Sequence, residues 1–149
     1  MQPKTCPECG GELPEGRTCQ SVFEEFLALE FVDPGYGAVH MLTVACYSIQ
    51  HGLYSPAALT WIEQRLRDHL ERGVPVEWIR RQAAGETGAG KRGWRVTRRA
   101  GDPPQAHIAW SLTIQNVAAD YRDADSYREL VEAWARATLA EMQPLVQRS

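Results

Sequence analysis

The feature that most constrains this chain is the sequence Cys-Pro-Glu-Cys-Gly near its N-terminus, at residues 6–10. Two cysteines separated by two residues can turn around one metal ion and direct both sulfurs toward it. Gly10 and Gly11 provide the backbone freedom that such a turn needs. Cys19 follows at the predicted start of a helix, where the positive end of the helix dipole favours a thiolate. Cys6, Cys9 and Cys19 therefore predict a zinc site, which needs a fourth ligand.

The fourth ligand follows from the helices that come next. Apolar residues at helical spacing predict a helix over about 19–31 and a second from Pro34 to about His51. A short connection makes these helices antiparallel neighbours, so the end of the second lies beside the start of the first. We favour His51, because it lies at the helix end that faces the cysteines. Cys46 is the alternative fourth ligand, but it belongs to the apolar stripe of its helix and equally fits a buried small hydrophobe.

Two other interpretations of the cysteine pair are open. A redox-active Cys-x-x-Cys normally lies in a βαβ context, and no such context surrounds residues 6–9. Incidental thiols in an unordered tail are the second alternative. We prefer the metal site, because an N-terminal segment rich in glycine, proline and cysteine needs something to order it.

The rest of the chain predicts a mainly α fold: a helical bundle with an N-terminal zinc knuckle and a small β-hairpin. Asp33-Pro34 and Ser55-Pro56 both place a capping residue before a proline, which is typical of helix starts. The third helix ends near Gly73, a short fourth helix spans about 75–84, and a last helix spans about 125–147. Residues rich in β-branched and aromatic side chains at 94–99 and 107–114 predict the two strands of the hairpin.

We expect these elements to form one domain, because 149 residues is a common domain length. The expected organisation of residues 1–149 is a zinc knuckle at 1–19, helical hairpins at 20–84, a loop with the β-hairpin at 85–116, and a C-terminal helix at 117–149. The sequence has no run of 18 apolar residues and no signal peptide, so it predicts neither a membrane span nor export. In a reducing cytoplasm, four cysteines indicate thiols or metal ligands rather than disulfides.

A second candidate metal site lies at the opposite end of the expected bundle. If the second and third helices are also antiparallel, His40 and His69 lie at the same height, with Glu30 arriving from the first helix. Two histidines and a carboxylate can hold a catalytic metal. The simpler interpretation is that both histidines are partly buried and bonded to backbone or water.

The segment 80–99 is basic and contains an aromatic residue. Its cations surround Trp94, an arrangement that can hold a phosphate backbone or stack a base; they are Arg80, Arg81, Lys91, Arg92, Arg95, Arg98 and Arg99. The formal net charge of −3 argues against a dedicated nucleic-acid binder. A solvated surface balanced by acidic residues elsewhere is the alternative.

Several motifs resemble a bacterial family of small uncharacterised proteins, a domain of unknown function. The likeness rests on Cys-Pro-x-Cys-Gly at 6–10 and on Val-His-x-Leu-Thr-Val-x-Cys-Tyr-x-x-Gln-His at 39–51. The resemblance implies a bacterial, cytoplasmic protein and implies no activity. Its motifs use the positions of Cys6, Cys9, Cys19, His40, Cys46 and His51, which strengthens the metal hypothesis.

The sequence as a whole therefore favours a zinc-stabilised binding or regulatory module. Four protein ligands leave no open position on the ion, so the zinc would be structural. The alternatives are a metal-dependent enzyme that uses His40, His69 and Glu30, and a protein that contacts nucleic acid through residues 80–99.

Overall fold

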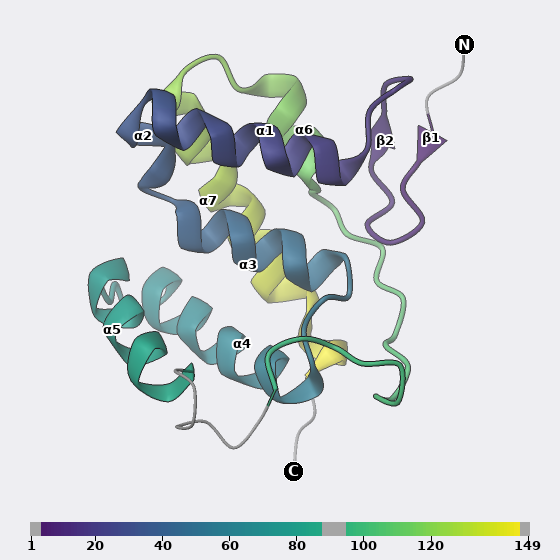
Figure 1. Cartoon of the computed structure of the whole chain (residues 1–149), viewed down its shortest axis with the longest axis vertical. Helices are drawn as coiled ribbons and strands as arrows, with labels where there is room; N and C mark the ends of the chain where they lie inside the picture. Colours follow the sequence, from purple (N-terminus) through teal and green to yellow (C-terminus); the bar gives the residue numbers. More distant parts are fainter. Residues whose placement is uncertain (1–3, 88–94, 147–149) are drawn as a thin grey trace.

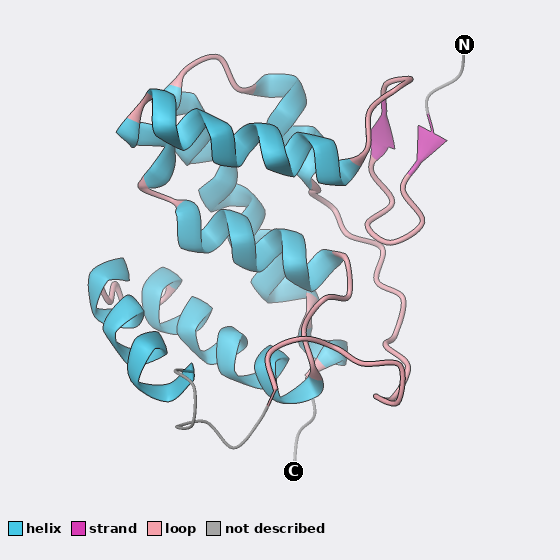
Figure 2. Cartoon of the chain, viewed as in Figure 1, coloured by secondary structure: helices cyan, strands magenta, loops and turns pink. Residues whose placement is uncertain are grey.

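The computed structural model describes residues 4–87 and 95–146, which form a mainly helical fold (Figures 1 and 2). The helices in chain order are α1 (Cys19–Val32), α2 (Pro34–Gly37), α3 (His40–Gln50), α4 (Pro56–Leu70), α5 (Val76–Thr87), α6 (Ile114–Asp120), α7 (Ala124–Glu141) and the 3-10 helix η1 (Gln143–Leu145). Two short strands precede them, β1 (Lys4–Thr5) and β2 (Glu12–Leu13). The predicted fold class is confirmed.

Helix α1 starts and ends at clear local signals. Thr18 is its N-cap, and the Thr18 hydroxyl accepts a hydrogen bond from the Ser21 backbone N–H at 3.0 Å. Such a cap satisfies one of the free donors in the first turn. At the other end Asp33 leaves the helical conformation, and its carboxylate accepts the Gly35 N–H at 2.9 Å to begin α2. Because Thr18 is the N-cap, Cys19 is the first residue of α1.

The predicted second helix is interrupted. The structure divides it into α2 and α3, with a break at residues 38–39. Gly35 and Gly37 lower helix propensity there, which explains why one continuous helix does not form. Helix α3 then runs back beside α1 (Figure 1), and the ring of Phe23 on α1 stacks on Tyr47 of α3 at 4.1 Å. This return places the C-terminal end of α3 near the start of α1.

Helix α7 is the centre of the bundle. It packs against α2, α3, α4 and α6. Trp134 and Tyr127 on α7 are fully buried, as are Phe26 of α1 and Leu42 of α3. Burying side chains of this size stabilises the fold by about 1.5–3 kcal/mol each before chain entropy is counted. The core therefore lies around α7, with residues from α1, α3, α4 and α6 and with Cys6, Cys9 and Leu13 of the N-terminal hairpin.

The β-hairpin lies elsewhere than predicted. In place of strands at 94–99 and 107–114, the structure pairs β1 with β2 in antiparallel register, with Lys4 opposite Leu13 and Thr5 opposite Glu12. Within 95–99 the structure has one isolated bridge, from Thr97 to Tyr54, and Trp94 lies outside the described residues. Ile114 begins α6, because Thr113 and Asn116 form a capping box and Ile114 and Val117 are buried on one side.

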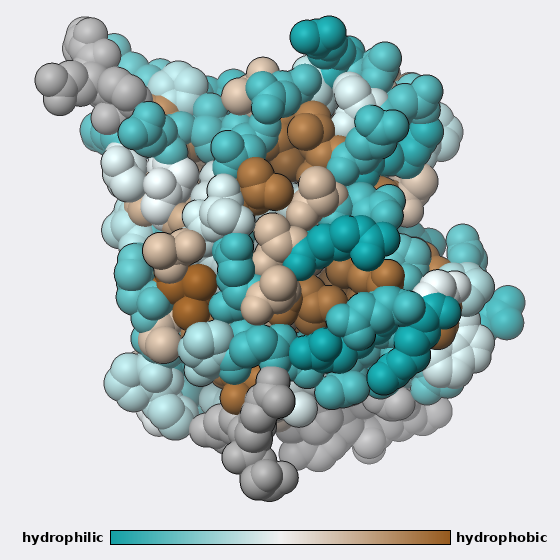
Figure 3. Space-filling model, turned by 180° about the vertical axis from the view of Figure 1, so that it is seen from behind, coloured by the Kyte–Doolittle hydropathy of each residue, from teal (hydrophilic) through white to brown (hydrophobic). Residues whose placement is uncertain are grey.

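Two surface observations complete the description. No helix within residues 4–87 and 95–146 has the length and apolar character required to cross a bilayer. On the face opposite that of Figure 1, hydrophobic residues form patches separated by hydrophilic side chains (Figure 3). Most of the large apolar side chains in the described residues are nevertheless buried.

Candidate metal centre

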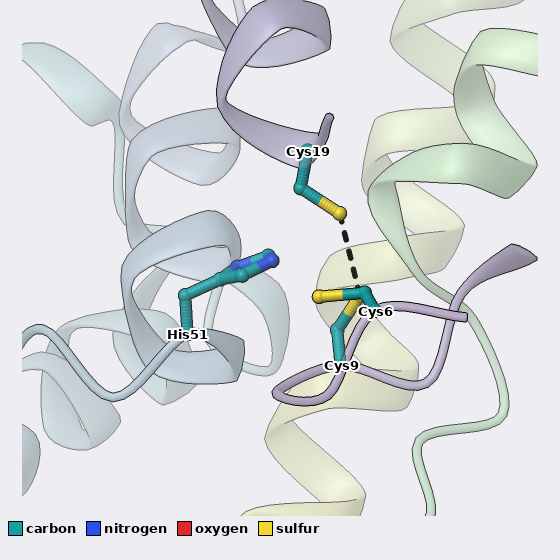
Figure 4. A group of neighbouring side chains, drawn as sticks. All are labelled: Cys6, Cys9, Cys19 and His51. Atoms are coloured by element: carbon teal, nitrogen blue, oxygen red, sulfur yellow. Dashed lines mark hydrogen bonds between the residues drawn. The ribbon is translucent and has the colours of Figure 1, made fainter. Parts of the chain in front are cut away.

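Four side chains from three separate segments meet at one point. The metal-binding atoms of Cys6, Cys9, Cys19 and His51 all lie within 4.8 Å of one another. Cys6 and Cys9 come from the hairpin loop, Cys19 from the start of α1 and His51 from the end of α3, and all four side chains point toward a common centre (Figure 4). In the described part of the chain, this is the only group of three or more such side chains that could hold a metal ion.

The loop between β1 and β2 has the backbone geometry of a metal knuckle. The Cys6 N–H donates to the Gly11 carbonyl and the Gly10 N–H donates to the Cys6 carbonyl, both at 2.9 Å. Gly10 has φ = 80°, a left-handed conformation that favours glycine. The Gly11 N–H points at the Cys9 sulfur at 3.4 Å, and a donor in this position stabilises a thiolate. This turn brings two sulfurs to the same side of the loop.

The knuckle packs closely against the start of α6. A Cβ atom at Gly11 would lie 2.7 Å from the Thr113 hydroxyl and 3.4 Å from the Cys9 sulfur. The absence of a side chain at position 11 is therefore what lets the loop reach Thr113. Cys6, Cys9 and Cys19 are between 2% and 7% exposed, so the sulfurs are almost removed from water.

The spacing of the Cys9 and Cys19 sulfurs suits a tetrahedral ion. The Cys9 and Cys19 sulfurs are 3.7 Å apart. Two thiolates that each bind zinc at about 2.3 Å in a tetrahedral arrangement lie about 3.8 Å apart. Three sulfurs and one imidazole nitrogen also form one of the usual ligand sets of structural zinc sites.

His51 is oriented by its own helix. Its Nδ1 donates a hydrogen bond to the Tyr47 carbonyl at 2.7 Å, which leaves Nε2 as the atom with a free lone pair. That Nε2 is buried and makes no hydrogen bond of good geometry, although the Cys9 sulfur is near enough to raise the pKa of the imidazole. Metal-binding histidines commonly have the second nitrogen bonded in this way, because the bond fixes the tautomer and the ring orientation.

The pKa values of the three thiols are shifted in different directions. The pKa of Cys9 is lowered to about 4, mainly because Cys19 donates a hydrogen bond to it, and this outweighs the opposing effect of burial. The pKa of Cys19 is raised by the same bond and by burial, and burial also raises the pKa of Cys6. For His51, burial alone would lower the pKa, but the nearby Cys9 thiolate and the Tyr47 carbonyl raise it. The cluster thus carries negative charge at Cys9 that a cation can bind.

Cys46 lies away from the group. It is fully buried in α3, where burial raises the pKa of its thiol to about 12 and Thr138 partly opposes this shift. Its place in the core follows from the apolar stripe on which it lies. The structure therefore brings together Cys6, Cys9, Cys19 and His51, and metal binding by them stays a prediction.

The three residues of the expected second site separate into two local interactions. His40 Nδ1 lies 2.9 Å from both carboxylate oxygens of Glu30, which links α3 to α1. His69 Nδ1 instead bonds the Val74 carbonyl at 2.8 Å, just after α4 ends. Glu30, His40 and His69 do not form a metal-binding group in the part of the chain that the structure describes.

The basic segment is only partly described. Lys91, Arg92 and Trp94 lie outside the described residues. Arg95 forms a salt bridge with Asp102 at 2.9 Å, and Arg98 donates to the Pro103 carbonyl. Both guanidinium groups therefore bond to partners in the same turn of the chain.

Tyr47 and Thr113 contribute to the site and were not expected from the sequence. Tyr47 orients His51, and Thr113 receives the knuckle. The spacing of Tyr47 and His51, four residues apart on one helix, is the one signal that points to the first of them. Thr113 meets the knuckle only through the tertiary fold.

Comparison with known protein families gives a match over most of the chain. A family model described as Family of unknown function (DUF5946) matches residues 4–143. No curated protein and no solved structure matches the chain.

Proposed function

We propose that this chain, which belongs to the family of unknown function DUF5946, is a zinc-stabilised binding module in which Cys6, Cys9, Cys19 and His51 hold one structural zinc ion. A zinc ion here joins the hairpin loop to the ends of α1 and α3. The ion would take the place of the two protons on Cys6 and Cys19. Its binding is therefore coupled to the packing of the first 19 residues on the bundle.

The observation that carries this proposal is the environment of His51 Nε2. A buried imidazole nitrogen without a hydrogen bond of good geometry costs stability, because water can no longer satisfy it. Three cysteines surround this atom within 4.8 Å. A zinc ion satisfies the nitrogen and all three sulfurs at the same time, whereas a disulfide would use only two of the sulfurs.

The ligand set favours a structural role for the ion. Thiolates and imidazole suit zinc, and four protein ligands complete its tetrahedral shell. A catalytic zinc keeps one position for water or substrate. The proposed role is therefore to fix the knuckle against the helices.

Elemental analysis of protein purified without added metal tests the proposal. We expect about one zinc per chain and tetrahedral sulfur and nitrogen coordination by X-ray absorption. Cys9→Ser should lose the zinc, and Cys46→Ala should keep it, because Cys46 is a buried cysteine outside the cluster. An ordered knuckle in zinc-free protein would contradict the proposal.

The two alternative functions have less support. A metal-dependent enzyme at His40, His69 and Glu30 lacks the convergence of ligands that it requires. Nucleic-acid binding through 80–99 would draw on Arg95 and Arg98, which are already engaged in their turn. We also expect a bacterial cytoplasmic setting, where reducing conditions keep thiolates available for metal.

A further inference from the structure

The Cys9 and Cys19 sulfurs lie in direct contact, 3.7 Å apart. A disulfide needs a separation of about 2.05 Å, so the two sulfurs would have to approach by about 1.7 Å. Cys9 lies in the loop between β1 and β2, which can follow this movement more easily than the first turn of α1. The pair is therefore placed to form a disulfide after a small local change.

A zinc ion and a disulfide would exclude each other at this pair. Tetrahedral zinc holds two thiolates about 3.8 Å apart, whereas a disulfide holds the sulfurs at about 2.05 Å. Once Cys9 and Cys19 are bridged, Cys6 and His51 are the remaining members of the group. Two ligands are too few for a structural zinc site, which needs four. Formation of the bridge should therefore release the ion.

A groove of about 410 Å³ leads to the edge of the cluster. Its walls include Cys6, Cys19 and His51, which come from three separate segments of the chain (Figure 4). Cys6 and Cys19 are 7% and 5% exposed, whereas Cys46 is 0% exposed and lies in the core. A molecule as small as hydrogen peroxide should therefore meet the cluster thiols and not Cys46.

We propose that the metal centre is an oxidation site, at which hydrogen peroxide links Cys9 to Cys19 by a disulfide and releases the zinc. The Cys19 thiolate attacks one peroxide oxygen, the O–O bond breaks, and a sulfenic acid and a hydroxide form. The Cys9 thiolate then attacks the Cys19 sulfur, which forms the S–S bond and displaces a second hydroxide. Two electrons pass from the sulfurs to the peroxide, and both hydroxides take up protons to give water.

Oxidation would change which segments are joined. The zinc ion connects the hairpin loop to α1 through Cys19 and to α3 through His51. The disulfide keeps the connection to α1 and loses the connection to α3. This inference rests on the proposed function, since only a zinc-loaded cluster has an ion to release. A thiol reductant and zinc should restore the first state.

The test treats the full-length, zinc-loaded chain with a small excess of hydrogen peroxide. We expect release of one zinc per chain, measured with a chromogenic chelator, and loss of two of the four thiols, counted in denatured protein. Peptide mass mapping should find Cys9 bridged to Cys19 and Cys46 unmodified. Dithiothreitol followed by zinc should reverse both changes. A bridge that includes Cys6, or oxidation of Cys46, would overturn the inference.

Cys46→Ala is the matched control, because it leaves only the three cluster thiols. This variant should release zinc at the wild-type rate and end with one free thiol per chain. Slower release would show that Cys46 takes part and would contradict the assignment.

The zinc content before and after treatment distinguishes the two proposals. Zinc that stays bound in the presence of peroxide overturns the oxidation site and leaves the metal centre standing. A chain that holds no zinc before peroxide is added overturns the metal centre and, with it, this inference.

Discussion

The ring of Tyr47 lies 4.3 Å from the ring of His51, and the Tyr47 carbonyl accepts the hydrogen bond from His51 Nδ1 at 2.7 Å. The other face of Tyr47 stacks on Phe23 of α1. One residue therefore orients the imidazole and also joins the two helices that converge on the cysteine cluster. The geometry of the site therefore depends on the packing of α1 against α3 as well as on the hairpin loop.

Loss of one cluster cysteine should act locally. We expect Cys9→Ser to abolish protection from hydrogen exchange over residues 4–18, because the proposed zinc ion would contribute several kcal/mol to the segment that it orders. Helix α7 should keep its protection, since it packs mainly against the helices α2, α3, α4 and α6. Cys46→Ala is the control, and should lower protection modestly throughout the core by about 1–2 kcal/mol. Equal loss across the chain in Cys9→Ser would contradict this division.

A methyl group at position 11 should separate the knuckle from α6. In Gly11→Ala the added Cβ would meet the Thr113 hydroxyl at 2.7 Å. We expect a loss of about 1–3 kcal/mol in unfolding free energy, the usual cost of overpacking. Gly101→Ala is the control, because nothing lies within 4 Å of its Cβ position. Chemical denaturation measures both, and equal stability of the two variants would refute the role of this contact.

Alkaline pH should destabilise the core through Tyr127. Burial is the main cause that raises the pKa of this phenol from 10.0 to about 12, and its hydrogen bond with Thr43 partly opposes the shift. The folded state therefore keeps the proton between pH 10 and 12, where the unfolded state loses it. Stability is full below pH 10 and decreases as pH rises toward 12, by up to about 2 kcal/mol. Urea unfolding at pH 9–11.5 should show a shallower decrease for Tyr127→Phe, and parallel curves would contradict the assignment.

The histidines away from the cluster should not affect the metal. His40→Ala removes the partly exposed bond between His40 Nδ1 and the Glu30 carboxylate, so the expected cost is at most about 1 kcal/mol. His69→Ala removes the bond to the Val74 carbonyl and should cost about 0.5–1.5 kcal/mol. Zinc content should stay at the wild-type value in both. A loss of one metal ion per chain in either variant would instead support a metal site at Glu30, His40 and His69.

Local signals made several elements predictable from sequence. Asp33 and Ser55 cap the helices that they were expected to cap, because a capping bond involves only neighbouring residues. Helix α6 was missed, since its seven residues are too short to show a periodic pattern. Strands β1 and β2 were missed for the same reason, because two residues cannot show alternation.

At the metal centre, the position of one residue could be predicted from the sequence, whereas the contacts of the residue next to it could not. The position of His51 near the cysteines followed from antiparallel helices and the rise per residue. The partners of Gln50 did not, although it precedes His51 directly. Leu112 and Thr138 reach Gln50 only after α7 has packed against α3, and no local pattern encodes contacts over such sequence distances.

The position of His51 at the end of α3 also has a kinetic consequence. Cys6, Cys9 and Cys19 are close in sequence, but the fourth group arrives only after the chain has passed through α1, reversed at α2 and completed α3. The complete site therefore needs α1 and α3 to have packed together, and we expect this to follow the folding transition state. Interactions that form after the transition state slow unfolding and leave the folding rate nearly unchanged. The metal would then act chiefly as a kinetic lock, lengthening the lifetime of the folded state.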